Sequence, residues 1–318
     1  MGVTAGAQPR IAVVGTGAVG ASFAFALMQS GLARELVLID RNEELAEGHA
    51  MDLNHGMPFA PPLDIRAGTY ADCRGADIVV ITAGVPQRPG ESRLELASRN
   101  AAIMKDIVHS VVDYAPEAIL LVATNPLDVM TYAALRFSGF PRERIIGSGT
   151  ALDTSRLRFL LSRHCGVDAR NIHAYIIGEH GDSEVPVWSG ATIGGIRLLD
   201  YCPLCERACE PHEREAIFGQ VVRAAYEIID RKGATYYAVA LAMVRICQAI
   251  VRDEHSVLTV STLIEGQYGV EGVCLSLPTV LGAAGAGRIL APRLEEGEEE
   301  GFRRCAQMMR EIIDGLDL

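Results

Sequence analysis

Short runs of apolar residues alternate with longer amphipathic stretches over the first half of the chain. The runs IAVVG, ELVLID, ADIVVITAG, AILLVATN and RIIGSG are apolar nearly throughout, and segments with helical periodicity follow most of them. Strands without polar and apolar alternation are typical of parallel sheets that helices cover on both faces. The pattern therefore predicts an α/β fold, with a doubly wound parallel sheet in the first half.

The rhythm of the sequence changes beyond about Gly149. A helix-like segment at 151–165 is followed by the strand-like HAYIIG, by helical stretches at 211–231 and 234–251, and by the β-rich runs SVLTVSTLI and VCLSLPTVLG. This second half is typical of an α+β domain. A length of 318 residues suits about two domains, and we expect them to be residues 1–148 and 149–318.

Composition excludes several classes of function. The 29 Lys and Arg residues against 40 Asp and Glu residues give a net charge of −11, which would repel a nucleic-acid backbone or an anionic membrane. The eight cysteines are too sparse for a disulfide scaffold, which favours reduced thiols in the cytoplasm. Residues 11–28 could be mistaken for a signal peptide or a membrane span, but interrupting glycines, Thr16 and Ser22 favour strand, turn and helix. We expect no nucleic-acid or membrane partner.

A glycine-rich turn follows the first strand. Gly15, Gly17 and Gly20 form G-x-G-x-x-G directly after IAVV, where a helix would begin near Ala18. Glycines there allow a tight turn and close approach of a pyrophosphate, and the helix N-terminus offers unpaired N–H groups to its charge. Asp40 ends the next strand, where a carboxylate would accept hydrogen bonds from an adenosine ribose and repel the extra phosphate of NADP. The sequence therefore predicts NAD as cofactor.

Four further segments carry a resemblance to a known family. GVPQRPGESR, ATNPLD, GTALDTSRLR and HAYIIGEHGDSEVPVW occur in this order at 84–93, 123–128, 149–158 and 173–188. Together they resemble the L-lactate dehydrogenase branch of the lactate/malate dehydrogenase family, from about Arg10 to the C-terminus. The resemblance implies an NAD-binding Rossmann domain over 1–148 and a catalytic substrate domain over 149–318.

The resemblance also implies an activity. It is the reversible reduction of pyruvate to (S)-lactate by hydride transfer from NADH, the end step of fermentative glycolysis. Malate dehydrogenase or another 2-hydroxy-acid dehydrogenase is the alternative. A binding protein that kept the fold without turnover would be expected to lose some of the reactive residues, and all are present.

His180 lies in GEHGD, and the resemblance makes it the acid-base residue that exchanges a proton with the substrate oxygen. Imidazole both gives and takes a proton near neutral pH. Asp153 would hold the second ring N–H and stabilise the imidazolium. Arg156 follows Asp153 by three positions, so on a helix the two side chains share a face, and its planar guanidinium suits a substrate carboxylate. Arg93 follows a segment that looks like the family's closing loop, from which it would reach the developing alkoxide.

Substrate choice is expected to depend on Gln87. Malate dehydrogenases of the family carry an arginine two places before the P-G of this loop, to pair the second carboxylate of oxaloacetate. A neutral Gln87 leaves that carboxylate without a countercharge, which favours pyruvate. The adjacent Arg88 could take the position if the loop slipped by one residue, although Pro89 and Gly90 fix the register.

The resemblance assigns further contacts. Asn125 would orient the substrate oxygen, and Thr235 would line the far side of the substrate. The expected substrate-binding residues are Gln87, Arg93, Asn125, Asp128, Asp153, Arg156 and Thr235. The expected cofactor-binding residues are Gly15, Gly17, Val19, Gly20, Asp40, Tyr70, Ala83, Gly84, Ala123, Asn125 and Ser148.

Two last features concern regulation and metal. Arg158 and His173 match two positions that bind fructose 1,6-bisphosphate in allosterically activated bacterial members of the family, which tend to form homotetramers. The cluster CPLCERACEPH, with Cys202, Cys205, Cys209 and His212, has spacings that zinc could use. It lies in a short segment that the family varies, and the reaction needs no metal, so we expect none.

Overall fold

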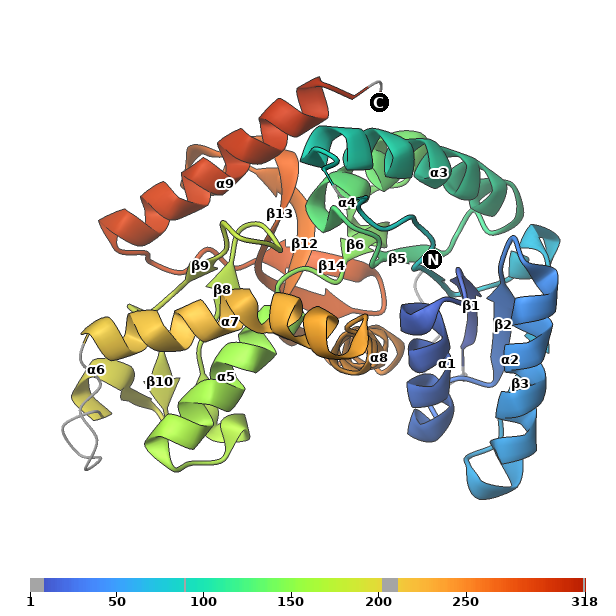
Figure 1. Ribbon diagram of the computed structural model, residues 1–318, viewed down its shortest axis with the longest axis horizontal. Coiled ribbons are helices and arrows are strands. Elements are labelled where there is room, and N and C mark those ends of the chain that lie inside the picture. Colours follow the sequence, from blue (N-terminus) through green and yellow to red (C-terminus); the bar gives the residue numbers. More distant parts are fainter. Residues whose placement is uncertain (1–8, 89, 202–210, 317) are drawn as a thin grey trace.

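A single large sheet runs through the centre of the molecule (Figure 1). The computed structural model describes residues 9–88, 90–201, 211–316 and 318. The first half of the chain supplies six parallel strands, namely β1 (Arg10–Val14), β2 (Glu35–Ile39), β3 (Asp64–Ala67), β4 (Ile78–Ile81), β5 (Ile119–Val122) and β6 (Ile145–Gly147). They lie in the order β6-β5-β4-β1-β2-β3. The winding direction reverses between β1 and β4, and ligands of such sheets bind at the carboxyl ends of the strands beside this point.

Helices cover both faces of these strands. The strands β1, β2, β4 and β5 lead in turn into the helices α1 (Ala18–Ser30), α2 (Glu43–Gly56), α3 (Arg93–Tyr114) and α4 (Leu127–Ser138). In β1, Ile11 and Val13 pack into one hydrophobic cluster, whereas Ala12 and Val14 pack into another on the opposite face. Both faces of the strand are buried, which explains why its sequence is apolar throughout, as predicted.

The second half of the chain extends the same sheet. The antiparallel strands β12 (Ser256–Glu265), β13 (Glu271–Gly282) and β14 (Gly285–Ile289) complete the order β14-β13-β12-β6-β5-β4-β1-β2-β3. β12 meets β6 where Ser261 lies opposite Gly147. The β-rich runs of the second half were expected within a separate α+β unit. They instead cover the edge of β6, which would otherwise present unpaired N–H and C=O groups.

The rest of the described second half consists of helices and two small sheets. The helices are α5 (Ala151–Cys165), the short α6 (Leu198–Tyr201), α7 (Pro211–Lys232), α8 (Tyr237–Val251) and α9 (Glu296–Asp314). Two small sheets consist of β7 (Ile172–His173), β10 (Thr192–Ile193) and β11 (Ile196–Arg197), and of β8 (Ile176–Ile177) and β9 (Val185–Pro186).

Several local predictions can be compared with these bounds. The helix expected at 151–165 is α5, and it ends at Gly166, whose φ of 69° suits a glycine cap. The helix expected from 234 begins at Tyr237. Residues 11–28, the segment that could mimic a membrane span, form β1, a turn and most of α1. Among the described residues, no helix combines the length and apolarity that a membrane crossing requires.

Candidate active site

His180 and Asp153 form a close hydrogen-bonded pair. His180 lies in the loop between β8 and β9, and Asp153 lies in the first turn of α5. Nδ1 of His180 is 2.5 Å from Oδ2 of Asp153. The Asp153 side chain is 3% exposed and the His180 side chain is 25% exposed. One ring nitrogen is therefore held by a buried carboxylate, and the other makes no hydrogen bond to a described residue, which leaves it for a ligand.

Ser276 of β13 fixes the two segments that carry this pair. Its Oγ accepts a hydrogen bond from the backbone N–H of Thr150, directly before α5, at 3.0 Å. Its backbone N–H and C=O both pair with Gly178, two residues before His180, at 2.9 Å. Segments that are far apart in sequence thus meet on one strand, which gives the pair a rigid base.

Asp128 holds the backbone of His180 from the other side. This residue of α4 is 2% exposed. Its Oδ2 accepts a hydrogen bond from the backbone N–H of His180 at 2.7 Å, and its Oδ1 accepts one from Ser261 Oγ at 2.6 Å. Burial raises the pKa of Asp128 to about 7, although both hydrogen bonds oppose the rise. Asp128 was expected to contact substrate, and here it lies beneath the loop and supports it.

Electrostatics keep a proton on His180. Burial by itself would lower the pKa of His180, but the charge and hydrogen bond of Asp153 outweigh it, with further help from Asp128 and Glu184, and raise the pKa to about 9. Burial likewise opposes the ionisation of Asp153, yet His180 and Arg156 together keep the pKa of Asp153 below its usual value. At neutral pH the pair is therefore an imidazolium and a carboxylate.

Arg156 shares a helix face with Asp153, as its spacing predicted. Its Nη1 donates to Oδ1 of Asp153 at 2.7 Å, and its side chain is 15% exposed. The remaining guanidinium nitrogens have no partner within the described part of the chain. Arg156 therefore adds a cation beside His180 that retains donors for an anionic ligand.

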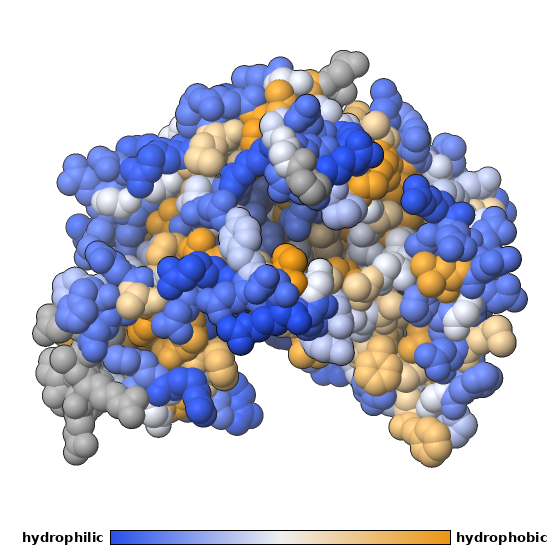
Figure 2. All heavy atoms as spheres, viewed as in Figure 1, coloured by the Kyte–Doolittle hydropathy of each residue, from blue (hydrophilic) through white to orange (hydrophobic). Residues whose placement is uncertain are grey.

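Arg93 lies across from His180 at the start of α3. Its guanidinium pairs with Glu179 at 3.3 Å and with Asp182 at 2.5 Å, on either side of His180 in sequence. Tyr226 of α7 donates to the other oxygen of Asp182 at 2.8 Å. The surface is hollowed between α3, α7 and α9, with a mostly hydrophilic rim (Figure 2). Arg93 is thus placed near the pair, but its guanidinium is already ion-paired with two carboxylates of the protein.

The loop before α3 is organised around Glu91, which the sequence analysis did not single out. Glu91 accepts hydrogen bonds from Arg99 Nε at 2.7 Å and from the backbone N–H of Arg88 at 2.8 Å. Gln87 is exposed, and its Nε2 donates to the backbone C=O of Glu91 at 2.8 Å. The structure therefore does not bring Gln87 to His180, and the loop conformation it describes folds Gln87 onto its own backbone.

Asn100 of α3 connects this loop to Asn125, and it was also missed. Its Oδ1 accepts from the backbone N–H of Val85 at 2.8 Å, and its Nδ2 donates to the backbone C=O of Asn125 at 2.7 Å. Asn125 itself is exposed and precedes a cis peptide bond to Pro126. The sequence signal that could have identified Asn100 is its place on the apolar face of an amphipathic helix, where a polar residue is unusual. Asn100 is indeed buried, with 2% of its surface exposed.

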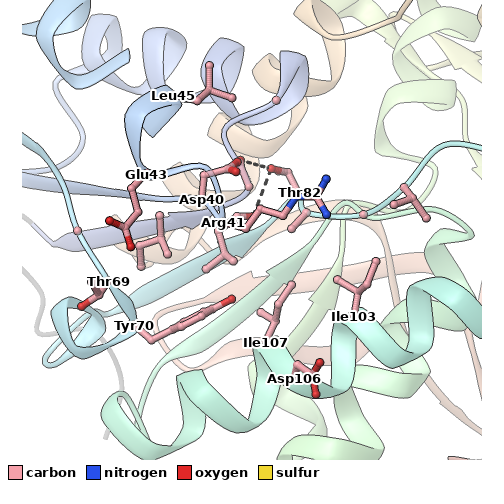
Figure 3. Close-up of a pocket in the computed structure, with 18 residues that line it drawn as sticks. Asp40, Arg41, Glu43, Leu45, Thr69, Tyr70, Thr82, Ile103, Asp106 and Ile107 are labelled. Carbon is pink, nitrogen blue, oxygen red and sulfur yellow. Dashed lines mark hydrogen bonds between the residues drawn. The ribbon is translucent and has the colours of Figure 1, made fainter. Parts of the chain in front are cut away.

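A second cavity lies at the carboxyl ends of β1, β2 and β4. It has a volume of about 520 Å³, and its lining includes Gly15, Gly17, Asp40, Tyr70, Ala83 and Gly84 from the expected cofactor-binding set. Asp40 lies at one wall, and the side chains of Tyr70, Ile103 and Ile107 lie at the opposite wall (Figure 3). Polar side chains around an apolar slot, with Asp40 at the end of β2, suit a nucleoside.

The glycine turn fits a dinucleotide. Gly15 has a φ of 97°, and a Cβ there would lie 2.5 Å from the backbone of Ala83, so only glycine is accommodated. A Cβ on Gly20 would lie 1.9 Å from the carbonyl oxygen of Gly15. Gly17, in contrast, faces open space and caps α1 without any side-chain hydrogen bond. The N-terminus of α1 is therefore accessible to a pyrophosphate.

Asp40 is ionised and already bonded. Its carboxylate accepts from the backbone N–H of Thr16 at 2.7 Å and from that of Asn42 at 3.0 Å. Partial burial opposes the ionisation of Asp40, but the effect of these hydrogen bonds is larger and lowers the pKa of Asp40. Thr16 Oγ1 also donates to Oδ2 at 3.1 Å, so Oδ1, which accepts only from Asn42, is the oxygen that can accept a further bond from a ribose hydroxyl.

The other expected contacts lie on the following elements. Val19 and Gly20 belong to α1, Ala123 follows β5, and the backbone N–H of Ser148 donates to Val122 at 2.9 Å. Thr235 is half-buried in the turn between α7 and α8. The lining of the cavity at Asp40 includes none of these five residues.

The expected regulatory residues lie apart from both sites. Arg158 Nε donates to the backbone C=O of Ala174, next to His173 on β7, at 3.1 Å. Burial lowers the pKa of Arg158, and its guanidinium lies 5.4 Å from the ring centre of Tyr175. Arg158 also lines a cavity of about 490 Å³ together with Arg170 and Arg245, whereas His173 is exposed outside that lining.

Cys202, Cys205 and Cys209 of the possible zinc site lie outside the described residues, and His212 is exposed at the start of α7. Over the ranges that the structure covers, no group of three or more His, Cys, Asp or Glu side chains could hold a metal ion.

Comparisons with known proteins agree with this geometry. Residues 9–147 match the NAD binding domain of lactate/malate dehydrogenase, and residues 150–316 match its alpha/beta C-terminal domain. An L-lactate dehydrogenase of Thermoanaerobacter sp. (strain X514) is 53% identical over 309 residues, which is 97% of this chain and 99% of that protein. One of Acetivibrio thermocellus is also 53% identical, over 97% of this chain and 98% of that protein.

Solved structures show the same similarity. A lactate dehydrogenase from a Medee basin deep-sea metagenome library has a TM-score of 0.94 and 44% sequence identity, over 97% of this chain and 98% of that chain. A minor L-lactate dehydrogenase of Enterococcus mundtii has a TM-score of 0.94 and 40% identity, over 96% and 98%. The fold and the paired sites define an NAD-dependent oxidoreductase of the α/β class. The chain belongs to the lactate/malate dehydrogenase family.

Proposed function

We propose that the protein is an L-lactate dehydrogenase, which reduces pyruvate to (S)-lactate with NADH and catalyses the reverse reaction. The observation that carries the proposal is the His180–Asp153 pair with Arg156 on the same helix face. An imidazolium and a guanidinium side by side suit a 2-keto acid, whose keto oxygen needs a proton and whose carboxylate needs a cation. The relatives named L-lactate dehydrogenase support pyruvate as substrate. Pyruvate-dependent oxidation of NADH by the purified chain tests the proposal.

The chemistry assigned to each residue follows from its position. NADH, when bound, supplies a hydride to the keto carbon. His180 donates the proton on Nε2 to the keto oxygen. Asp153 stabilises the imidazolium before that step, and its hydrogen bond to Nδ1 holds the orientation of the ring afterwards. Arg156 directs its free donors to the substrate carboxylate. In lactate oxidation, the neutral His180 takes the hydroxyl proton.

Arg93 requires a rearrangement to take part. It must leave Glu179 and Asp182 before it can stabilise charge on the keto oxygen. We propose that closure of the loop at 85–92 brings Gln87 and Arg93 toward the substrate, with Asn125 and Thr235 completing the walls.

Domain and cofactor assignments belong to the same proposal. We assign residues 1–148 to NAD binding and 149–318 to substrate binding, and the family matches over 9–147 and 150–316 support a division near residue 148. Within the first domain, Val19, Gly20, Ala123 and Ser148 are assigned to the cofactor along with the residues that line its cavity. Cys73, Cys247, Cys274 and Cys305 are buried free thiols, which suits a cytoplasmic enzyme of fermentative glycolysis.

The assignment of Asp40 gives a prediction. Asp40→Ser is expected to weaken NADH binding by roughly 10- to 100-fold, because charged hydrogen bonds to the ribose are lost. It should also relax discrimination against NADPH, since the charge that repels the 2′-phosphate is gone. Fluorescence titration of both proteins with NADH and NADPH measures the two affinities. An unchanged ratio of the affinities would show that another group excludes NADPH.

We also propose a homotetramer that fructose 1,6-bisphosphate activates through Arg158 and His173. The support is the cationic lining of the cavity at Arg158, to which Arg170 and Arg245 contribute. Copies of these residues facing each other across an interface would repel one another, and a bisphosphate would supply the countercharge.

This regulation predicts that the sugar bisphosphate lowers the pyruvate concentration needed for half-maximal rate and favours the larger assembly. In Arg158→Gln both effects should be lost, because the countercharge for the phosphate is removed. Kinetics and light scattering with and without the ligand measure them. Equal activation of the two proteins would exclude Arg158 from the site, and an unresponsive wild type would exclude the regulation while leaving the catalytic assignment intact.

A further inference from the structure

Asn100 is a buried amide side chain of α3 with no role in the mechanism above. Its Oδ1 accepts a hydrogen bond from the backbone N–H of Val85 at 2.8 Å. Its Nδ2 donates to the backbone C=O of Val85 at 3.1 Å and to that of Asn125 at 2.7 Å. An amide side chain has two N–H donors and one carbonyl acceptor, so all of these groups have a partner. The three bonds fix one orientation of the amide, because the reverse orientation would place donor against donor.

The helix face that carries Asn100 is otherwise apolar. Ala97, Met104 and Ile107 lie on the same face of α3 at helical spacing, and all three belong to the hydrophobic core. Water has little access to such a place, so removal of the amide would leave the carbonyl oxygens that it holds with fewer partners. A polar side chain in this position therefore calls for an explanation.

The two segments that Asn100 joins follow neighbouring strands of the sheet. β4 and β5 are paired in parallel, so their carboxyl ends lie side by side, and Val85 and Asn125 come shortly after these ends. Val85 is also the first residue of the loop at 85–92, which closes over the substrate in the proposed function. Asn100 thus links the base of that loop to a residue that is assigned to the substrate.

A second hydrogen bond joins the same two segments one or two residues earlier. Thr124 is buried, and its Oγ1 donates to the backbone C=O of Ala83 at 2.7 Å. Gly84 lies between the two connections. A Cβ on Gly84 would lie 2.6 Å from the side chain of Thr124 and 3.3 Å from Oδ1 of Asn100. The two strand ends are therefore closely packed, with little room for one to shift without the other.

The direction of the Asn125 side chain depends on this support. The residue is exposed, and its side chain makes no hydrogen bond to any residue that the structure describes. Its direction is therefore set by the backbone, whose C=O Asn100 holds. In the proposed function this side chain orients the substrate oxygen, so an error in the backbone position is transmitted to the substrate.

We propose that Asn100 is a positioning residue for pyruvate reduction, which holds Asn125 at the base of the closing loop so that its side chain meets the substrate oxygen. The inference rests on the proposed function, in which Asn125 contacts the substrate. Asn100 is not among the residues that line the cavity at Asp40, and it touches neither substrate nor cofactor in this account. It acts through the backbone of Asn125.

Asn100→Ala removes all three hydrogen bonds. We expect kcat/KM for pyruvate at saturating NADH to fall by about 10- to 100-fold, because a small misplacement of an orienting group is costly in the transition state. The dissociation constant for NADH, measured by fluorescence titration, should change by less than about threefold, since the glycine turn and Asp40 are untouched.

A double-mutant cycle shows whether Asn100 acts through Asn125. Asn125→Ala removes the side chain but keeps the backbone C=O that Asn100 holds, so the cycle isolates the positioning effect. If the Asn125 side chain transmits the effect, Asn100→Ala should lower kcat/KM by less than about threefold in the Asn125→Ala background. A merely structural residue would lower kcat/KM by the same factor in both backgrounds.

Asn54→Ala is the matched control. Asn54 of α2 also uses its Nδ2 to hold a strand, since it donates to the backbone C=O of Ile65 at 2.8 Å, and it does not line the cavity at Asp40. Loss of this bond should lower the melting temperature and leave kcat/KM for pyruvate within about twofold of wild type. An equal loss of kcat/KM in the control would overturn the proposal, because the effect would then come from stability alone.

Asn100→Asp replaces Asn100→Ala in the cycle if the alanine variant does not fold. The carboxylate keeps the shape of the side chain and an acceptor for the N–H of Val85, but it has no N–H to donate to Asn125. It should show the same loss of kcat/KM and the same dependence on the Asn125 side chain. If neither variant folds, Asn100 serves folding, and a separate positioning role is overturned.

Two further outcomes separate failure of the inference from failure of the proposed function. Equal factors in the two Asn125 backgrounds, in a protein whose wild type reduces pyruvate, would overturn the positioning role and leave the proposed function intact. A wild type that does not reduce pyruvate would overturn the proposed function, and the inference with it.

Discussion

Replacement of His180 by asparagine is expected to lower kcat for pyruvate reduction by roughly 10²- to 10⁴-fold, the usual contribution of a positioned acid-base group. Asparagine keeps polar atoms near Asp153 but has no proton to transfer at any accessible pH. The affinity for NADH, measured by fluorescence titration, should stay close to that of wild type, because the cavity at Asp40 and Tyr70 does not include His180.

A matched control separates this loss from a general effect on folding. His109→Asn changes an exposed histidine on α3 whose ring contacts Phe137, remote from the pair. It should leave kcat within the error of the assay. If His180→Asn retains most of the wild-type kcat, the proton comes from another group, and the mechanism proposed above is wrong.

Gln87→Arg is expected to shift preference from pyruvate toward oxaloacetate. The variant supplies the missing countercharge at the end of the substrate that differs between the two keto acids. The ratio of their kcat/KM values should therefore change by a factor on the order of 10² or more, which corresponds to several kcal/mol of transition-state stabilisation. The effect depends on loop closure, because the structure folds Gln87 onto the backbone of Glu91.

Arg88→Gln is the informative companion variant. The backbone N–H of Arg88 is held by Glu91, and its side chain is exposed, so its removal should not alter the ratio of the two keto acids. A large change in Arg88→Gln together with none in Gln87→Arg would mean that the loop closes one residue out of the expected register. An unchanged ratio in both variants would show that neither side chain faces the substrate.

Local features of the site could be predicted from the sequence. The three glycines between the first strand and helix identify the dinucleotide turn, because backbone clearance at Gly15 and Gly20 depends on residues nearby in the chain or in the adjacent strand. The Asp153–Arg156 contact follows from helical spacing alone, and it forms in α5. Such contacts are fixed by periodicity, which a sequence displays directly.

Features that depend on long-range packing could not be predicted. The run SVLTVSTLI predicts a strand, but it does not indicate which strand will be its neighbour. In the structure it pairs with β6, where Ser261 lies opposite Gly147, and so extends the first sheet. Arg93 pairs with carboxylates that are more than 80 positions away in the sequence. Asn100 likewise connects the loop at Val85 to Asn125. Asp128 was assigned to the substrate by resemblance, and only its three-dimensional environment places it beneath His180. The pKa shifts depend on the same contacts and were equally out of reach.

The central claim is that this chain is a lactate dehydrogenase selective for pyruvate, and steady-state kinetics of NADH oxidation test it most directly. The purified protein is assayed with pyruvate and with oxaloacetate at neutral pH, with and without fructose 1,6-bisphosphate. The account predicts rapid oxidation with pyruvate and a kcat/KM at least about 10²-fold lower with oxaloacetate, given the uncompensated second carboxylate. Comparable or higher kcat/KM for oxaloacetate, or no pyruvate-dependent oxidation under either condition, would contradict it.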